Sequence, residues 1–488
     1  MSTAPGTAAV AIVRVSGPQS LPALARLLLG AGLPTSRQAA LRTLRHPLTG
    51  EPLDKAMVLA LPGPHTATGE DMVELHTHGS RAVVASVLRA LEVLQPELGL
   101  APALPGEFTR RGFLSGKLSL AEVEGLSDLL AAETEAQRVQ AMALFGGALV
   151  ARASAWRASV LRLLASLEAV LDFSPDEPDV GAEALHAECR AGAAALVGEL
   201  EEELVGGERG ELVRSGVKCV LFGAPNAGKS SLLNALLSRD AAIVSPRAGT
   251  TRDVLRVSLD LGGVLCTLSD TAGLREAGDE VEAEGIERAR AEVSAAAVRV
   301  LVVDSALLAA ALCERKGEGP TSKGALLKDL LPLPQQQGKV GSLLVVLNKC
   351  DLVRLQPEEG AVLEALERVG LGSVASAPFT LVSVSCKSGQ GIGALLKALE
   401  RFAAGVAWGE GGAQPRQPPL LTRARHRHAV RACAAALQRF LEVQGQAGLP
   451  ELACEELRLA ARALEPLIGD FTTEDLLEDI FKRFCIGK

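Results

Sequence analysis

The spacing of apolar positions changes along the chain and divides it into segments. Strands are predicted at three short apolar runs near the start, Ala9–Val15, Met57–Leu61 and Met72–His76. Between and after them, Leu21–Leu29 and Ala82–Leu94 repeat apolar residues every three to four positions, as helices do. The pattern predicts an N-terminal α+β domain over residues 1–117.

A helical pattern follows and returns near the end of the chain. Apolar spacing near 3.6 is found at Leu118–Phe145, Leu149–Leu171, Ala182–Leu204, Ala424–Val443 and Leu452–Leu467. A Gly- and Pro-rich linker is predicted at Gly405–Pro419. We therefore expect a helical bundle domain in two parts, residues 118–214 and 403–488, with another domain, residues 215–402, inserted between them.

The inserted segment begins with a phosphate-binding loop. Gly223–Ser230 reads GAPNAGKS, between a predicted strand, Val217–Phe222, and a predicted helix, Ser231–Leu237. In that context glycines let backbone N–H groups face phosphates, and the helix N-terminus adds positive potential. Lys229 would reach the β- and γ-phosphates, and the Ser230 hydroxyl would bind Mg²⁺. The predicted fold is a P-loop (Ras-like) GTPase domain within a multidomain α/β and α protein.

The other guanine-nucleotide motifs follow in the expected order. Gly249–Asp253 fits a first switch, in which Thr251 offers a hydroxyl to Mg²⁺, and a predicted strand at Val264–Ser269 leads into Asp270–Gly273. Further strands, Leu343–Leu347 and Phe379–Val384, precede Asn348-Lys-Cys-Asp351 and Ser385-Cys-Lys387. The Asp351 carboxylate can accept hydrogen bonds from guanine N1 and N2, a pair of donors that adenine lacks.

The residue at position 274 bears on how GTP would be hydrolysed. Many such proteins have a Gln there that orients the attacking water, whereas this chain has Leu274. No arginine finger is evident, and the lack of one costs about 10³–10⁵ in rate. A bound cation or a partner is therefore implied. Nearby candidates for a substitute are Arg275, Glu276, Asp279, Glu280 and Glu282.

Composition narrows the class of protein. A chain of 488 residues with 48% hydrophobic and 22% charged residues is globular and has several domains. Nine scattered cysteines without a C-x-x-C pair argue against a zinc site and a disulfide framework. No run is long and apolar enough for a membrane span, and the first residues lack the Arg-rich pattern of a transit peptide.

Because the net charge is −8, nucleic-acid contacts need local basic patches. The basic run at residues 423–431 is one candidate, and the solvated face of a helix is the alternative.

Several polar residues of the N-terminal domain could have either a structural or a ligand-binding role. Arg14 and Lys117 fit ordinary surface cations as well as ligand-binding residues. Glu74 lies in an apolar strand, where a carboxylate needs a partner. His76 and His78 alternate on that strand as a metal pair would, but no third ligand is visible, which favours structural roles.

The chain ends in Phe484-Cys-Ile-Gly-Lys488. Cys485 is fourth from the end, yet Gly487 and Lys488 fit a prenylation signal poorly. The alternatives are an ordinary terminus and a tail that presents a thiol and an ammonium to an active site.

Taken together, these motifs resemble the MnmE/TrmE family of tRNA-modifying GTPases over nearly the whole chain. The resemblance is carried by AIVRVSG, GPHTATGED, VELHTHG, PGEFTRRGF, GKLSLAEVEGL, the nucleotide motifs and the FCIGK tail. The stretch LLTRARHRH at residues 420–428 is most similar to mitochondrial members, which implies a mitochondrial matrix protein, with a bacterial-type cytoplasmic protein as the alternative.

The resemblance implies an N-terminal formyl-tetrahydrofolate-binding and dimerisation domain over residues 1–117. It also implies a homodimer and an FAD-dependent partner of the MnmG type. With that partner, family members install an aminomethyl-type group, taurinomethyl in mitochondria, on C5 of the wobble uridine of certain tRNAs. Family members usually begin with a longer, glycine-rich segment, so we expect the N-terminal sheet and the dimer surface to be incomplete here.

The family's site residues transfer to matching positions of this chain. The folate site is implied to contain Arg14, Glu74, Lys117 and Lys488. K⁺ would be bound by Asn226 and by the segment that includes Ser245 and Thr250. Glu282 would order the attacking water, and Cys485 would serve the modification chemistry. The implied GTP site comprises Asn226, Ala227, Gly228, Lys229, Ser230, Ser231, Ser245, Gly249, Thr250, Thr251, Asp270, Thr271, Ala272, Gly273, Asn348, Lys349, Asp351, Ser385, Cys386 and Lys387.

Two rival functions belong to other classes. A switch GTPase of ribosome assembly, without RNA chemistry, would need an RNA-binding domain after the GTPase, and the sequence there reads as helices. A lipid-anchored signalling GTPase would need a better terminal motif. Neither function accounts for the N-terminal domain.

Overall fold

A computed structural model gives the fold of two compact units. It describes residues 1–173, 182–239, 242–243, 256–270, 291–313, 342–353, 379–409, 412, 415, 417–443 and 450–469. One unit comprises residues 1–130, 142–197 and 432–488, and the other comprises residues 131–141 and 198–431. Among the described helices, none combines the length and the apolar character that a membrane crossing requires.

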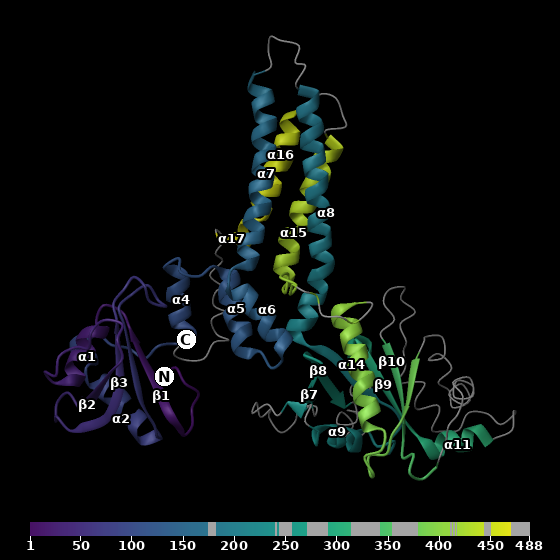
Figure 1. Cartoon of the computed structure of the whole chain (residues 1–488), viewed down its shortest axis with the longest axis horizontal. Coiled ribbons are helices and arrows are strands. Elements are labelled where there is room, and N and C mark those ends of the chain that lie inside the picture. Colours follow the sequence, from purple (N-terminus) through teal and green to yellow (C-terminus); the bar gives the residue numbers. More distant parts are fainter. Residues whose placement is uncertain are drawn as a thin grey trace, which may run out of the picture. The chain divides into compact units, whose positions relative to one another are not determined.

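The first unit begins with an antiparallel sheet of four strands in the order β1-β4-β3-β2 (Figure 1). Its strands are β1 (Ala8–Ser16), β2 (Ala40–Arg45), β3 (Pro52–Leu61) and β4 (Met72–Gly79). The helices of this region are α1 (Ser20–Leu28), α2 (Arg81–Val93), α3 (Gln95–Leu98) and α4 (Glu107–Leu114). The three predicted strands and two predicted helices are confirmed, whereas β2, α3 and α4 were not predicted.

One face of this sheet forms the core. Val13, Val58 and Leu75 pack with apolar residues of α1 and α2, such as Leu24 and Val87, and all are buried. Side chains alternate between the two faces of a strand, so residues of even number on β1 and β4 occupy the opposite face. That opposite face contains the polar residues discussed below.

The helices that follow are long, and one predicted helix is divided. They are α5 (Leu120–Ala131), α6 (Glu135–Phe145), α7 (Ala148–Phe173), α8 (Ala182–Ser215), α15 (Ala424–Val443), α16 (Pro450–Ala463) and α17 (Glu465–Ile468). The helical pattern over Leu118–Phe145 is confirmed, and the segment forms two helices, α5 and α6. The Gln137 side chain accepts from the N–H groups of Glu133 and Thr134, which satisfies donors at the start of a second helix.

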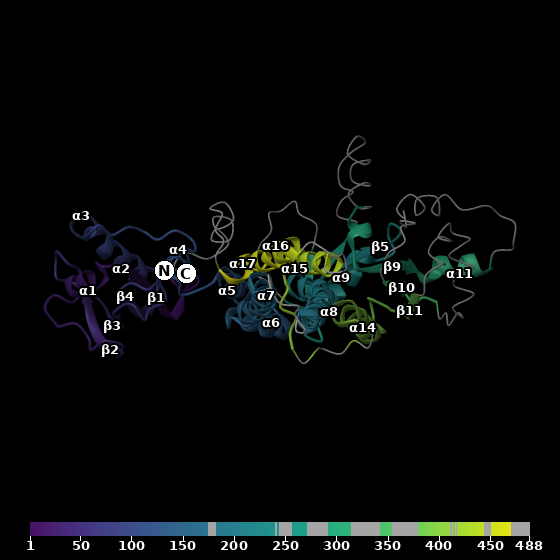
Figure 2. The same ribbon diagram turned by 90° about the horizontal axis from the view of Figure 1, so that it is seen from above.

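Within the first unit, segments far apart in sequence pack as helix pairs. α7 lies beside α16 and α17 (Figures 1 and 2). Arg458 pairs with Glu168 across this contact at 2.6 Å, and Arg157 pairs with Glu465 at 3.5 Å. The helical segments on the two sides of the inserted domain therefore pack against each other, as the sequence predicted.

The second unit is built on a seven-stranded sheet in the order β11-β10-β9-β5-β8-β7-β6. Its strands are β5 (Val217–Phe222), β6 (Ala242–Ile243), β7 (Arg256–Leu261), β8 (Val264–Asp270), β9 (Val298–Asp304), β10 (Ser342–Asn348) and β11 (Phe379–Ser383). β5, β8, β9, β10 and β11 are parallel, whereas β6 and β7 join through antiparallel pairing. A mostly parallel sheet gathers the carboxyl ends of its strands at one edge, where ligands of such folds bind.

Helices α9 (Lys229–Leu237) and α14 (Ile392–Trp408) contribute to one core on the same face of this sheet, and α11 (Ser305–Cys313) follows β9 directly. The prediction that a linker begins at Gly405 was wrong, because α14 continues to Trp408. Ala403, Ala407 and Trp408 are buried against the sheet, and this burial stabilises the last turn despite the glycine.

Candidate functional site

The phosphate-binding loop connects β5 to α9, as its motif predicts. The loop needs glycine at its first and sixth positions. Gly223 has a φ of +146°, and a Cβ there would lie 2.2 Å from the Val302 carbonyl oxygen. Gly228 has a φ of +94°, and a Cβ there would lie 2.1 Å from Asn348 Nδ2. Side chains at these two positions would therefore collide with β9 and with Asn348 at the end of β10.

Lys229 lies over this loop and not out in solvent. It is only 7% exposed, and its Nζ donates to the carbonyl oxygens of Gly223 at 3.0 Å and Ala224 at 2.9 Å. Lys229 is also the first residue of α9, so its ammonium adds to the positive end of the helix dipole. This arrangement attracts anions, and phosphate groups fit its charge and its backbone donors.

The segment after β10 contacts the phosphate-binding loop directly. Asn348 is 2% exposed, and its Nδ2 donates to the Ala227 carbonyl oxygen at 2.9 Å. The Lys349 ammonium bridges the Asn226 carbonyl oxygen at 2.9 Å and Asp304 Oδ2 at 2.7 Å. Asn226 itself has a φ of +63°, a left-handed conformation that Asn tolerates better than most residues. The structure thus brings together the two motifs that the sequence places more than a hundred residues apart.

The segment after β11 completes this edge of the sheet. The Cys350 N–H donates to the Val384 carbonyl oxygen at 3.1 Å, and the Cys386 Sγ–H donates to Asn348 Oδ1 at 3.3 Å. Ser385 is fully buried, and its hydroxyl oxygen accepts from the Ser388 N–H at 3.2 Å. Asn348–Asp351 and Ser385–Lys387 are therefore neighbours, as recognition of one base by both segments requires.

The charge state of Asp351 suits recognition of a base through N–H donors. A hydrogen bond from the Ser385 side chain is the largest influence and lowers the pKa of the Asp351 carboxyl, despite a smaller opposing effect of desolvation. The positive charge of Lys387 lowers this pKa further. Asp351 is thus ionised at neutral pH and accepts hydrogen bonds only.

Many of the predicted site residues lie outside the described residues. They are Ser245, Gly249, Thr250, Thr251, Thr271, Ala272, Gly273, Leu274, Glu282, Cys485 and Lys488. Asp270 is described as the last residue of β8, next to β5, which places its backbone beside the strand that leads into the phosphate-binding loop. The roles predicted for all these residues remain predictions.

In the N-terminal domain, the structure pairs two of the predicted folate residues. Arg14 and Glu74 are opposite each other on β1 and β4, and Arg14 Nε donates to Glu74 Oε1 at 2.8 Å. The other carboxylate oxygen of Glu74 lies 3.0 Å from His76 Nε2. Burial, the largest influence, would raise the pKa of Glu74, but the His76 hydrogen bond and the Arg14 charge together lower it. The carboxylate is therefore ionised and positioned from both sides.

The two strand histidines have different partners, which fits the structural reading. His76 contacts Glu74, whereas His78 Nδ1 lies 2.7 Å from Asp54 Oδ1. Among the described residues, no group of three or more potential metal ligands gathers around either of them.

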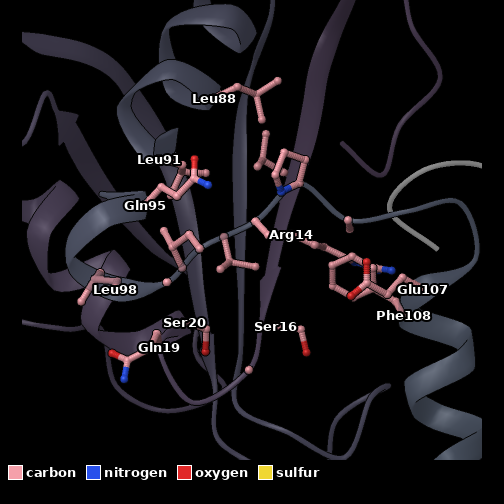
Figure 3. A pocket seen from close by; sticks show the side chains of 18 of the residues that line it. Arg14, Ser16, Gln19, Ser20, Leu88, Leu91, Gln95, Leu98, Glu107 and Phe108 are labelled. Carbon is pink, nitrogen blue, oxygen red and sulfur yellow. The ribbon is translucent and has the colours of Figure 1, made fainter. Parts of the chain in front are cut away.

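A cavity of about 570 Å³ lies next to Arg14 (Figure 3). Arg14 and Ser16 on β1, Leu91 and Gln95 near α2, and Glu107 and Phe108 of α4 contribute to its lining. Its walls thus combine apolar and polar groups, which suits a small organic ligand with both kinds of surface. Of the predicted folate-binding residues that the structure describes, Arg14 lines this cavity, whereas Glu74 and Lys117 do not. Lys117 follows α4, and its Cε lies 3.8 Å from the position that a Cβ on Gly69 would take.

Sequence reasoning missed a second polar network beside this cavity. Arg111 of α4 donates to Glu70 Oε2 at 3.0 Å and pairs with Glu107, and the Ser16 hydroxyl donates to Glu70 Oε2 at 3.1 Å. The Ser16 hydroxyl also lies 2.7 Å from Thr68 Oγ1. The GPHTATGED and PGEFTRRGF runs contain most of these residues, but nothing in their spacing shows that they meet.

The basic run at residues 423–431 is only partly exposed. Arg427 pairs with Glu211 at 2.5 Å and is 12% exposed, and His426 is fully buried. His428 and Arg431 are exposed. Much of this run therefore packs against the protein, which leaves a smaller basic surface than the sequence predicted.

Comparisons with known proteins cover the whole chain. Residues 1–117 match the family model "GTP-binding protein TrmE N-terminus", and residues 120–485 match "MnmE helical domain". The chain is 45% identical to "tRNA modification GTPase MnmE" of Parvibaculum lavamentivorans, a match that covers 100% of this chain and 99% of that protein. It is 42% identical to "5-taurinomethyluridine-[tRNA] synthase subunit GTPB3, mitochondrial" of Rattus norvegicus and to the protein of the same name in Homo sapiens. Each of these matches covers 100% of this chain and 92% of the relative. These matches agree with the guanine-nucleotide motifs at the edge of the sheet, and the chain belongs to the MnmE/TrmE family of tRNA modification GTPases.

Proposed function

We propose that this protein hydrolyses GTP as part of a tRNA modification reaction. With an FAD-dependent partner of the MnmG type, it would install an aminomethyl-type group on C5 of the wobble uridine of certain tRNAs. The observation that carries this proposal is the meeting of the Asn348–Asp351 and Ser385–Lys387 segments with the phosphate-binding loop, in a chain whose relatives are named for this modification.

The nucleotide would be bound by groups at the carboxyl edge of the sheet. Backbone N–H groups of the loop and the Lys229 ammonium would complement its phosphates, and Asp351 would read the base. Mg²⁺ would be coordinated by the Ser230 hydroxyl, and by Thr251 while the γ-phosphate is present. It would neutralise the charge that develops on the phosphates. The glycine-lined loop and its cationic lysine fit such an anion.

Hydrolysis requires substitutes for the missing Gln and arginine finger. We assign K⁺ to Asn226, Ser245 and Thr250, and we assign the ordering of the attacking water to Glu282. Asn226 lies within the phosphate-binding loop in a left-handed conformation, which Asn tolerates, and this position in the loop supports the first assignment.

A one-carbon tetrahydrofolate would bind in the N-terminal domain. Arg14, Lys117 and Lys488 would complement its anionic glutamyl part, and Glu74, held ionised by Arg14 and His76, would accept hydrogen bonds from the N–H groups of its ring system. The cavity beside Arg14 supports this site with walls that combine apolar and polar groups. Cys485 would serve the modification itself.

The C-terminal tail can be tested separately from the GTPase. Deletion of residues 485–488 is expected to preserve basal GTP hydrolysis, to abolish wobble-uridine modification and to weaken folate binding. Both assays should use one preparation. Loss of hydrolysis together with modification would indicate a structural tail, and normal modification would show that the tail is dispensable.

The sheet face that contains Arg14 also supports a homodimer formed through the N-terminal domain. Leu41 pairs with Met57, and Met57 with His76, so these side chains form one row across that face. Leu41 is 57% exposed and Met57 is 47% exposed. An exposed apolar row beside polar groups is typical of an interaction surface. Met57→Glu should therefore shift the protein from dimer to monomer in light scattering.

The function itself is tested by mass spectrometry of wobble nucleosides from cells that lack the protein. Loss of a C5-aminomethyl-type uridine is expected, and its return requires the wild-type gene. Unchanged nucleosides with defective ribosomes would favour the alternative, a switch GTPase of ribosome assembly. A taurinomethyl group would support the mitochondrial matrix as its location, whereas other aminomethyl groups would favour a bacterial-type cytoplasmic protein.

A further inference from the structure

Two cysteines differ from the other described cysteines in their exposure. Exposure is described for seven cysteines, of which five are buried, namely Cys189, Cys219, Cys266, Cys433 and Cys454. Cys350 and Cys386 are partly exposed. Reagents in solution reach exposed thiols first, so these two are the accessible thiols among the seven cysteines whose exposure is described.

The two accessible thiols lie in the two segments that would read the base. Cys350 is within Asn348–Asp351, after β10, and Cys386 is within Ser385–Lys387, after β11. The Cys386 hydrogen bond reaches the other segment, and that of Cys350 reaches the residue just before it. The Cys350 N–H donates to the Val384 carbonyl oxygen at 3.1 Å, and the Cys386 Sγ–H donates to Asn348 Oδ1 at 3.3 Å.

Cys386 also contacts the nucleotide site through Asn348. The Asn348 side chain accepts from Cys386 and from the Lys349 N–H at 2.8 Å, and it donates to the Ala227 carbonyl oxygen of the phosphate-binding loop. A change at the Cys386 sulfur therefore alters the buried amide that connects base recognition to the phosphates. Asp351 follows Cys350 directly, so a change at the Cys350 sulfur alters the base-reading carboxylate.

We propose that Cys350 and Cys386 are a redox-sensitive dithiol, which a low-molecular-weight disulfide converts into an internal disulfide that weakens guanine-nucleotide binding. The proposal rests on the proposed function, because it takes these two segments to be the base-recognition segments. It adds a modification site that controls nucleotide binding.

The chemistry is ordinary thiol–disulfide exchange. The Cys350 thiolate attacks one sulfur of the small disulfide, whose S–S bond breaks and releases one thiolate. Cys386 then loses its proton to solvent and attacks the Cys350 sulfur, which releases the second thiolate. Two electrons pass from the protein to the small disulfide, which ends as two thiols. Burial raises the pKa of the Cys386 thiol, so Cys350 makes the first attack.

The expected consequence is weaker binding of guanine nucleotides. A disulfide removes the Cys386 hydrogen bond to Asn348 and fixes the two segments at one separation. Loss of a hydrogen bond to a buried polar group is worth about tenfold in an equilibrium constant, so GDP affinity should fall by about that factor or more. Bound nucleotide occupies the space between the segments, so it should slow the oxidation.

The test uses the full chain, reduced and then exposed to oxidised glutathione. Intact mass should show the loss of two hydrogen atoms, and peptide mapping should find residues 350 and 386 in one linked pair. Binding of a fluorescent GDP analogue is measured before oxidation, after it, and after reduction with dithiothreitol, which should restore affinity. Cys350→Ser and Cys386→Ser, each compared with its own reduced form, should abolish the cross-link and the redox response. Cys189→Ser, which removes a buried thiol, is the matched control and should respond like the wild type.

The outcomes separate this inference from the function on which it rests. A glutathione adduct without a cross-link, a cross-link between other cysteines, or a cross-link with unchanged GDP affinity would overturn the dithiol while leaving the GTPase assignment intact. Reduced protein that binds no guanine nucleotide would overturn both.

Discussion

Asn348 and Ala227 join the segment after β10 to the phosphate-binding loop. Asn348 Nδ2 donates to the Ala227 carbonyl oxygen at 2.9 Å, and the close approach requires glycine at position 228. The Lys349 ammonium adds a second connection to the carbonyl of Asn226. The two ends of the nucleotide site are therefore one hydrogen-bonded structure, and damage to one end is expected to reach the other.

Asn348→Ala should weaken both binding and folding. The variant leaves the buried Ala227 carbonyl and the partly buried Lys349 N–H without their partner, which lowers the free energy of unfolding by about 1–3 kcal/mol. Urea unfolding and GDP titration would measure the two effects. Asn234→Ala, at an exposed position of α9, is the matched control and should change stability by less than about 0.5 kcal/mol. Equal effects of the two variants would show that the connection through Asn348 contributes nothing.

Asp351→Asn should change the base that the protein prefers. The ionised carboxylate accepts two N–H donors of guanine, whereas an amide presents one acceptor and one donor group. GTP affinity should fall, and xanthosine triphosphate, whose base offers the complementary pattern, should bind better than to the wild type. Competition binding with GTP, ATP and xanthosine triphosphate measures this. Equal ATP and GTP affinities in the wild type would contradict guanine recognition.

The helix and strands next to the nucleotide motifs could be predicted because the residues that indicate them are neighbours in the sequence. The strand before Gly223, the helix after it, and the strands before Asn348 and Ser385 each combine an apolar run with an adjacent motif. β7 has no such motif, and its strand geometry depends on pairing with β8. The last turn of α14 was missed because its glycine suggests a linker, while the burial that stabilises Trp408 comes from the sheet.

Side-chain pairs between residues far apart in the sequence could not be predicted from the sequence alone. The Arg14–Glu74 pair spans 60 positions, and the Arg111–Glu70 pair spans 41. Composition marks Glu74 as a strand carboxylate that needs a partner, but only the register of β1 on β4 identifies that partner. Nothing comparable distinguishes Glu70, which lies in a loop among several polar residues.

Hydrolysis should depend on K⁺. No arginine finger is evident in the sequence, so we expect a cation to supply the missing charge, and turnover should fall by about tenfold or more when Na⁺ replaces K⁺ at equal ionic strength. Asn226→Ala should abolish the difference, but alanine is strained at a φ of +63°. Asn226→Gly, which accepts this backbone, should give the same result. Equal rates of the wild type in the two salts would remove the cation from the mechanism.

Glu282→Ala should slow hydrolysis by about a hundredfold while GTP affinity stays near that of the wild type. The reason is the lack of the usual Gln after the D-T-A-G motif, which leaves a nearby carboxylate to order the water. Single-turnover hydrolysis and nucleotide titration separate the two effects. Glu280→Ala is the matched control two positions away. If that variant is the slow one, the water-ordering role belongs to a different acid of the segment.

The contribution of Glu74 to stability should depend on pH in a defined direction. The His76 hydrogen bond and the Arg14 charge outweigh burial and lower the pKa of Glu74 in the folded protein. A depressed pKa means that the stabilisation is present above the pKa of the unfolded state, about 4.3 for Glu. It is lost as the pH falls through the lower pKa of the folded state.

Glu74→Gln isolates the contribution of Glu74 ionisation to stability, because glutamine retains the size of the side chain but cannot ionise. Its melting temperature should lie below that of the wild type at neutral pH, and the gap should close as the pH falls below about 4. Glu51→Gln, at an exposed position before β3, is the control and should follow the wild type throughout. A gap that stays constant with pH would mean that Glu74 acts through packing alone. A gap that widens in acid would contradict the ionised pair with Arg14.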